Sequence, residues 1–150
     1  MTRKLLLILL SWVLTIGTFG QELDLSGFSE HKVIYHYNDS GKHIGDTANI
    51  GKKIGVRLNC CFQDSIHIYL NDSLITNKYY ATNPSTSNAG SIILDLPQTQ
   101  EELILTLVFP ETKDYCKIVL ANQYRYMTFD IVANRVKWAV IFENYLLSLE

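Results

Sequence analysis

The sequence predicts an all-β fold: a single antiparallel β-sandwich, with a closed antiparallel β-barrel as the alternative. Apolar residues recur at every second position through most of the chain, which is the period of a half-buried strand. Turn-like segments separate these stretches at near-regular spacing, as in all-β domains. Pro84, Pro97 and Pro110 fall between the predicted strands, where a missing N–H costs no ladder hydrogen bond.

Four strands are predicted in the first part of the domain: residues 33–37, 54–62, 66–70 and 74–80. The second of these places a run of apolar side chains on one face: Ile54, Val56, Leu58, Cys60 and Phe62. Asn71-Asp72 separates the third strand from the fourth. Both residue types tolerate positive φ, so this dipeptide predicts a hairpin.

The second part of the domain is predicted to add five strands and a short tenth strand or packed tail: residues 92–96, 103–109, 116–120, 127–131, 136–142 and 145–149. The parity of each strand decides which side chains point inward. The predicted core therefore includes Leu58, Ile68, Leu94, Leu105, Ile118, Phe129, Trp138 and Val140.

The N-terminal segment has the three parts of a cleavable signal peptide. Arg3-Lys4 gives a positive start, residues 5–16 are almost wholly apolar, and small residues lead up to Gly20. The apolar run is shorter than the roughly 20 residues that span a bilayer. We therefore expect residues 1–20 to be removed and the protein to be secreted or periplasmic. Residues 21–30 are interpreted as a loose lead-in, and residues 31–150 as one β-rich domain without a membrane span.

The charge of the chain disfavours nucleic acid as a partner. Removing Arg3 and Lys4 from the 13 lysines and arginines leaves 11 against 15 acidic residues, a net charge of −4. The basic residues are scattered, and Lys52-Lys53 is the longest basic run. Neutralising a phosphate backbone needs a concentrated basic surface, so we expect no nucleic-acid binding.

Three cysteines follow the signal segment, so at most one intrachain disulfide can form. Cys60 and Cys116 each share a face with apolar neighbours, and a bridge between them would join two layers across the core. This arrangement is similar to that of immunoglobulin-type sandwiches, so the fold is expected in the style of immunoglobulin or fibronectin type III domains. Cys61 is then the free, outward thiol. Two buried reduced thiols are the alternative.

Nine tyrosines are a further unusual feature, for which cross-strand packing is the favoured interpretation and a binding surface the functional one. Strand parity places five of them as candidates for the solvent face: Tyr69, Tyr79, Tyr80, Tyr124 and Tyr126. Exposed rings beside a Ser/Thr/Asn-rich loop are suited to contact a glycan or a protein partner. Cross-strand packing would instead use the rings to stabilise the sheet.

The sequence lacks the common catalytic motifs. Neither G-x-S-x-G, H-E-x-x-H nor a Walker loop is present. His31, His36 and His43 lie near Asp46 in the chain, but their spacing matches no closed metal site. We therefore expect neither catalytic residues nor a metal or other cofactor.

Three function hypotheses follow. The leading one is an exported non-enzymatic sandwich that serves as a binding or structural module of the cell envelope or extracellular space. The second is a small-ligand carrier with a lipocalin-like barrel, which needs a hollow interior. The third is an enzyme of unrecognised type.

Overall fold

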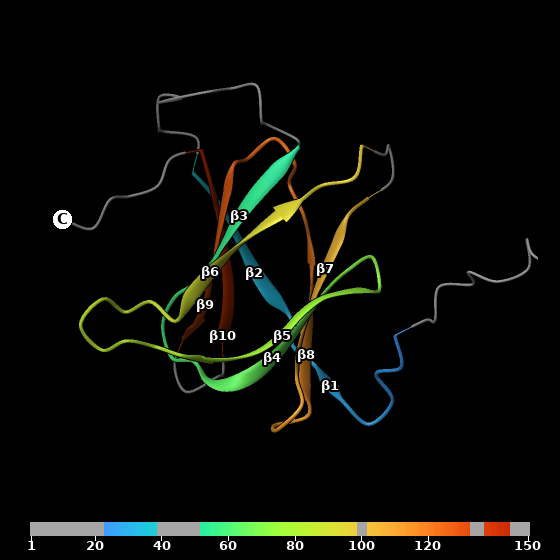
Figure 1. Ribbon diagram of the computed structural model, residues 1–150, viewed down its shortest axis with the longest axis vertical. Coiled ribbons are helices and arrows are strands. Elements are labelled where there is room, and N and C mark those ends of the chain that lie inside the picture. Colours follow the sequence, from blue (N-terminus) through green and yellow to red (C-terminus); the bar gives the residue numbers. More distant parts are fainter. Residues whose placement is uncertain (1–22, 39–51, 99–101, 133–136, 145–150) are drawn as a thin grey trace, which may run out of the picture.

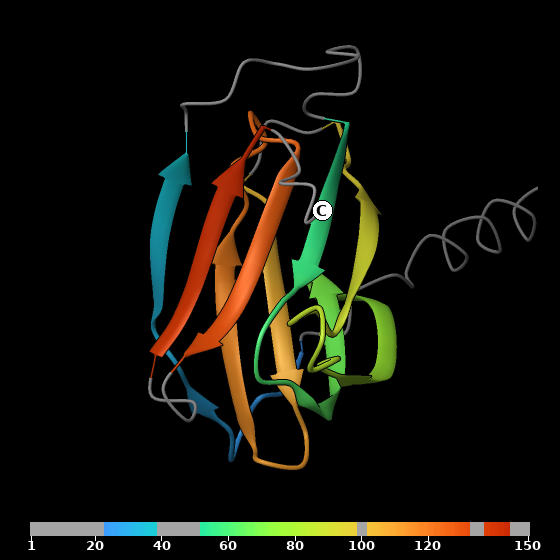
Figure 2. The same cartoon turned by 90° about the vertical axis from the view of Figure 1, so that its left-hand side faces the viewer.

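The computed structural model describes residues 23–38, 52–98, 102–132 and 137–144. These residues form two five-stranded sheets that pack face to face as a sandwich (Figure 1). Sheet A has the strand order β1 (Ser29–Glu30), β8 (Asp114–Val119), β7 (Ile104–Phe109), β4 (Gln63–Leu70) and β5 (Ser73–Ala81). Sheet B has the order β2 (Val33–Asn38), β10 (Lys137–Glu143), β9 (Tyr126–Val132), β3 (Lys53–Leu58) and β6 (Gly90–Asp95). Sheet B faces the viewer in Figure 2.

The predicted sandwich is confirmed, but the sheets are mixed and not purely antiparallel. β1 runs parallel to β8, β2 to β10 and β3 to β9. The alternation of apolar residues shows that a segment is a strand, yet it is the same for both strand directions. The barrel alternative is wrong, since the described strands form two separate sheets.

Strand β1 is not among the predicted strands, because two exposed residues carry no periodic pattern. Its backbone is nevertheless held on β8: the Ser29 N–H donates to the Lys113 carbonyl at 2.8 Å, and the His31 N–H donates to the Tyr115 carbonyl at 2.8 Å. The end of the expected lead-in is therefore part of sheet A. The predicted strand or tail at 145–149 and the signal segment lie outside the described residues.

The core fills the space between the sheets. All eight side chains predicted to be inside are at most 2% exposed. Trp138 is 1% exposed, and its ring lies edge-on to Phe109 at 5.0 Å and to Phe129 at 5.8 Å between centroids. His31 stacks on Trp138 at 4.4 Å and bonds through Nε2 to the Asp114 carboxylate at 2.9 Å. This histidine thus closes one side of the core.

The predicted strand 54–62 is shorter in the structure, because the chain leaves sheet B after Leu58 and enters sheet A at Gln63. Cys61 has a φ of 74°, which turns the chain between the sheets. The Asn59 N–H donates to the Phe129 carbonyl at 3.0 Å, so the end of β3 stays tied to β9. Phe62 is buried as predicted, although it reaches the core from the turn.

Candidate functional site

A cleft of about 310 Å³ opens on the outer face of sheet B, the face turned toward the viewer in Figure 2. Strands β3, β6, β9 and β10 and the segment before β6 contribute to it. Its lining consists of Gly55, Val56, Arg57, Asn88, Ser91, Ile92, Ile93, Tyr126, Thr128 and Glu143. We call this hollow the Gly55 cleft.

A glycine in the middle of a strand forms part of the cleft lining. Gly55 pairs with Ile93 of β6 on one side and with Tyr126 of β9 on the other. The Tyr126 ring leans over the glycine, so that a Cβ added there would lie 2.8 Å from Tyr126 Cδ1. A glycine inside a strand often marks such a close approach. The missing side chain leaves room for the Tyr126 ring, and both residues line the cleft.

Glu143 places a buried carboxylate in this cleft. Although it lies on the outer face opposite Tyr126, it is only 7% exposed. Its Oε1 accepts a hydrogen bond from the Thr128 hydroxyl at 3.4 Å, whereas its buried Oε2 has no partner in the described part of the chain. Burial raises the pKa of Glu143, and the bond from Thr128 and the charge of Arg57 oppose that rise. The unpartnered oxygen needs a donor, because a buried unsatisfied acceptor is costly.

Three basic side chains lie on the strands and the segment that line this cleft and the hollow next to it. Arg57 lines the cleft from β3, with β9 between it and Glu143, and no ion pair joins the two among the residues described. Arg125 lies over the Tyr126 ring at 5.7 Å, beside a second hollow of about 140 Å³ that shares Gly55 with the first. Lys53 is paired with Asp95 at 3.0 Å. The cleft therefore combines one buried acceptor with cations at its margin.

Apolar groups border the cleft on the side of β6. Ile93 projects from the outer face and is 73% exposed, the highest value among the exposed large apolar residues of the described chain. β6 is the last strand of sheet B, and no described strand pairs with its outer edge. A ligand in the cleft can therefore contact the exposed side chain of Ile93.

The five tyrosines predicted as a binding surface do not form one. Tyr80 and Tyr124 are 4% and 5% exposed and belong to the core. Tyr69 and Tyr79 project from the outer face of sheet A, and Tyr126 from the opposite side of the sandwich. The prediction fails for Tyr80 and Tyr124 because parity alone does not tell which face each sheet buries. Of the five, Tyr126 alone lines the cleft.

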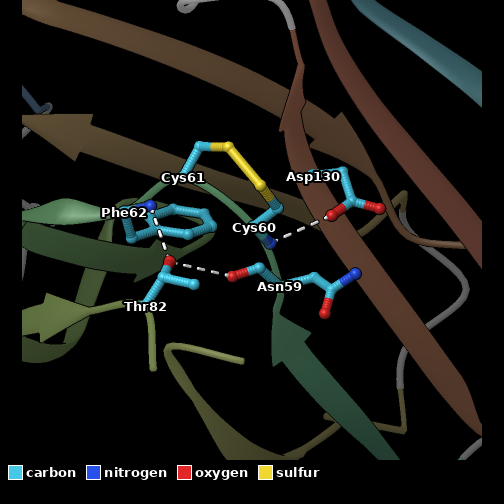
Figure 3. Close-up of a disulfide and its surroundings, with 6 residues drawn as sticks. All are labelled: Asn59, Cys60, Cys61, Phe62, Thr82 and Asp130. Carbon is cyan, nitrogen blue, oxygen red and sulfur yellow. Dashed lines mark hydrogen bonds between the residues drawn. A yellow bond between two sulfur atoms is a disulfide. The ribbon is translucent and has the colours of Figure 1, made fainter. Parts of the chain in front are cut away.

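The cysteines pair differently from the prediction. Cys60 is joined to Cys61 in a disulfide between adjacent residues (Figure 3). Cys116 is a free, fully buried thiol. The predicted Cys60–Cys116 bridge assumes that the strand continues through Cys60. The chain instead turns there, so Cys60 is only half-buried and does not share the core face of β3.

The environment of the disulfide is that of a tightly held turn. The Cys60 N–H donates to the Asp130 carboxylate at 3.2 Å, and the Phe62 N–H donates to the Thr82 hydroxyl at 2.8 Å (Figure 3). That hydroxyl donates in turn to the Asn59 carbonyl at 3.2 Å.

Burial raises the pKa of the Cys116 thiol well above its ordinary value, which disfavours a thiolate there.

The histidines considered as metal ligands are not brought together by the described structure. His31 is engaged with Asp114 and Trp138, while His43 and Asp46 lie outside the described residues. Within the described ranges, no group of three or more His, Cys, Asp or Glu side chains is placed to hold a metal ion.

Sequence reasoning misses the residues that make the cleft. A glutamate at the end of a strand suggests a solvated charge, and strand parity assigns Arg57 only to the outer face of its strand. The one available signal is Gly55, a glycine in the middle of a predicted strand. The burial of Glu143 depends on neighbouring strands that are distant in sequence, and strand order cannot be read from the chain.

Comparison of the chain with protein-family models, with curated proteins and with solved structures finds no match. In the part of the chain that the structure describes, no helix is long and apolar enough to cross a membrane.

Proposed function

We propose that this chain is an exported, non-enzymatic binding module whose recognition site is the Gly55 cleft. The observation that supports this most directly is the buried Oε2 of Glu143, which lines the cleft and has no partner within the described residues. A folded protein gains stability when such an acceptor is satisfied, so a ligand that supplies a donor is favoured there.

The shape of the cleft agrees with this role. Its volume of about 310 Å³ lies at the lower end of the range for small-molecule pockets. The immunoglobulin- or fibronectin-III-like sandwich expected from the sequence would serve only as a scaffold. Such a packed sandwich leaves one sheet face available for contacts. A protein or glycan partner would present one side chain or one sugar unit to such a cleft.

The cleft volume also favours a second candidate function, that of a small-ligand carrier. The lipocalin-like barrel expected for such a carrier is not the observed fold, since the core between the sheets is filled. A carrier of this architecture would hold its ligand on the outer face of sheet B.

Export is proposed from the Arg3-Lys4 start and the apolar run up to Ile16. Expression of the full sequence with its host's export machinery should release a protein whose first residue, by mass spectrometry, is Gln21. Retention of the full-length chain in the cytoplasm would refute this part of the proposal.

The recognition site is tested by titrating the labelled protein with four kinds of probe: an amino acid, an uncharged capped peptide, a monosaccharide and a carboxylate. Binding at the cleft should shift the amide resonance of Gly55 and leave that of the distant Gly27 in place. Ser91→Phe, at the cleft, should abolish the shift. The matched Asn77→Phe, on the outer face of the other edge strand, should preserve it. If no probe moves the Gly55 resonance, the proposed site is wrong.

A further inference from the structure

The charges of the Gly55 cleft are arranged as a dipole. Glu143 offers a buried carboxylate oxygen that accepts nothing from the described chain. Arg57 lines the same cleft from β3, two strands away, and no ion pair joins it to Glu143 among the described residues. Two opposite charges that share one pocket without meeting leave a place for a ligand to satisfy both.

A ligand with a single charge would satisfy only part of this site. A simple cation would meet Oε2 of Glu143 but would be repelled by Arg57, and by Arg125 beyond the Tyr126 ring. A simple anion would meet Arg57 but would be repelled by the buried carboxylate. A neutral ligand would forgo the stronger, charge-assisted hydrogen bonds.

The apolar part of the lining adds a third requirement. Ile93 borders the cleft from β6, and the Tyr126 ring borders it from β9. An aliphatic group placed against these side chains would be removed from water, which is favourable in proportion to the apolar area covered.

We propose that the Gly55 cleft binds a zwitterionic, amino-acid-like ligand, with its ammonium on Glu143, its carboxylate toward Arg57 and an aliphatic side chain against Ile93. This inference rests on the proposed function, because it names the ligand class of the same cleft. A free amino acid and a short unblocked peptide share the chemistry.

The experiment compares L-leucine with two half-ligands that keep its aliphatic group and one of its charges. Isopentylamine lacks the carboxylate, and 4-methylpentanoate lacks the ammonium group. Binding to protein expressed from the full sequence is followed at pH 7 by the Gly55 amide resonance. We expect leucine to bind about tenfold more tightly than either half-ligand, since each charged hydrogen bond contributes on that scale. Leucyl-leucine separates the two sources: tighter binding of leucine points to free amino acids, and tighter binding of the dipeptide points to peptides.

Isosteric variants assign the two ends of the ligand. Glu143→Gln should weaken leucine and isopentylamine by about tenfold and leave 4-methylpentanoate unweakened. Arg57→Gln should weaken leucine and 4-methylpentanoate and leave isopentylamine unweakened. Asp95→Asn removes a solvent-exposed carboxylate from the same face and should change none of the three.

The outcomes separate this inference from the function on which it rests. If a monosaccharide or the capped peptide moves the Gly55 resonance but leucine does not, the cleft is a recognition site and the zwitterion is wrong. If leucine binds no better than its halves, or if either isosteric variant leaves leucine binding unchanged, the dipole argument is refuted. If nothing moves the resonance, both proposals fall.

Discussion

The contact between Gly55 and Tyr126 gives a prediction whose sign can be worked from the structure. An alanine Cβ at position 55 would lie 2.8 Å from Cδ1 and 3.2 Å from Cε1 of the Tyr126 ring. Carbon atoms prefer separations of about 3.5–4.0 Å, so the ring must move away. Overpacking of this kind typically costs about 1–3 kcal/mol. Replacing glycine also restricts the unfolded chain, which stabilises by about 0.4–1 kcal/mol where the native backbone suits alanine.

These two effects oppose each other, and the clash is the larger. We therefore expect Gly55→Ala to lower the free energy of unfolding by about 1 kcal/mol. In a Tyr126→Ala background the obstructing ring is gone, so the same substitution should become stabilising by about 0.4–1 kcal/mol. The coupling between the two positions is thus predicted to exceed about 1 kcal/mol.

Urea unfolding measures this cycle, with the fluorescence of buried Trp138 as the signal. Gly27→Ala is the matched control. Gly27 has a φ of 81°, and nothing lies within 4 Å of an added Cβ. Its substitution should be destabilising to the same extent with and without Tyr126, because only backbone strain is involved. A Gly55–Tyr126 coupling below about 0.5 kcal/mol, within the usual error of additivity, would refute the packing argument.

Three further predictions test the core, the cysteines and the buried carboxylate. Leu105→Ala should cost about 2–5 kcal/mol in urea unfolding, since the side chain is fully buried, and a cost below about 1 kcal/mol would contradict its place in the core. Alkylation of the denatured, unreduced protein should label Cys116 alone, as peptide mass spectrometry would show, because Cys60 and Cys61 are joined to each other; a label on Cys61 would instead support the bridge predicted from the sequence. Because burial raises the pKa of Glu143 in the folded state, the folded protein binds that proton more tightly than the unfolded chain does. The stability of the native protein relative to Glu143→Gln should therefore be greatest below the ordinary pKa range of glutamate. It should fall as the pH rises through the raised pKa, with a slope of at most about 1.4 kcal/mol per pH unit. Parallel pH profiles of the two proteins would contradict the assigned burial.

The sequence determined most of the strands and, for most of them, the face that is buried. Alternation alone placed Leu58, Ile118 and Trp138 in the core, because an inward position on a strand must be apolar to leave water without penalty. It was misleading where the chain leaves a sheet. The apolar parity of 54–62 continues through Cys60, but the backbone turns there, so the pattern extended the strand and predicted the wrong disulfide.

Strand order and direction were decided only by the tertiary structure. The parallel pairs of β2 with β10 and of β3 with β9 join segments far apart in the chain, and no local pattern encodes such pairing. The Gly55 cleft depends on these pairings. Gly55 meets Tyr126, and Tyr126 meets Glu143, only because β9 lies between β3 and β10. A sequence specifies the faces of its strands through local periodicity, whereas a site built across neighbouring strands exists only once the strands have been ordered.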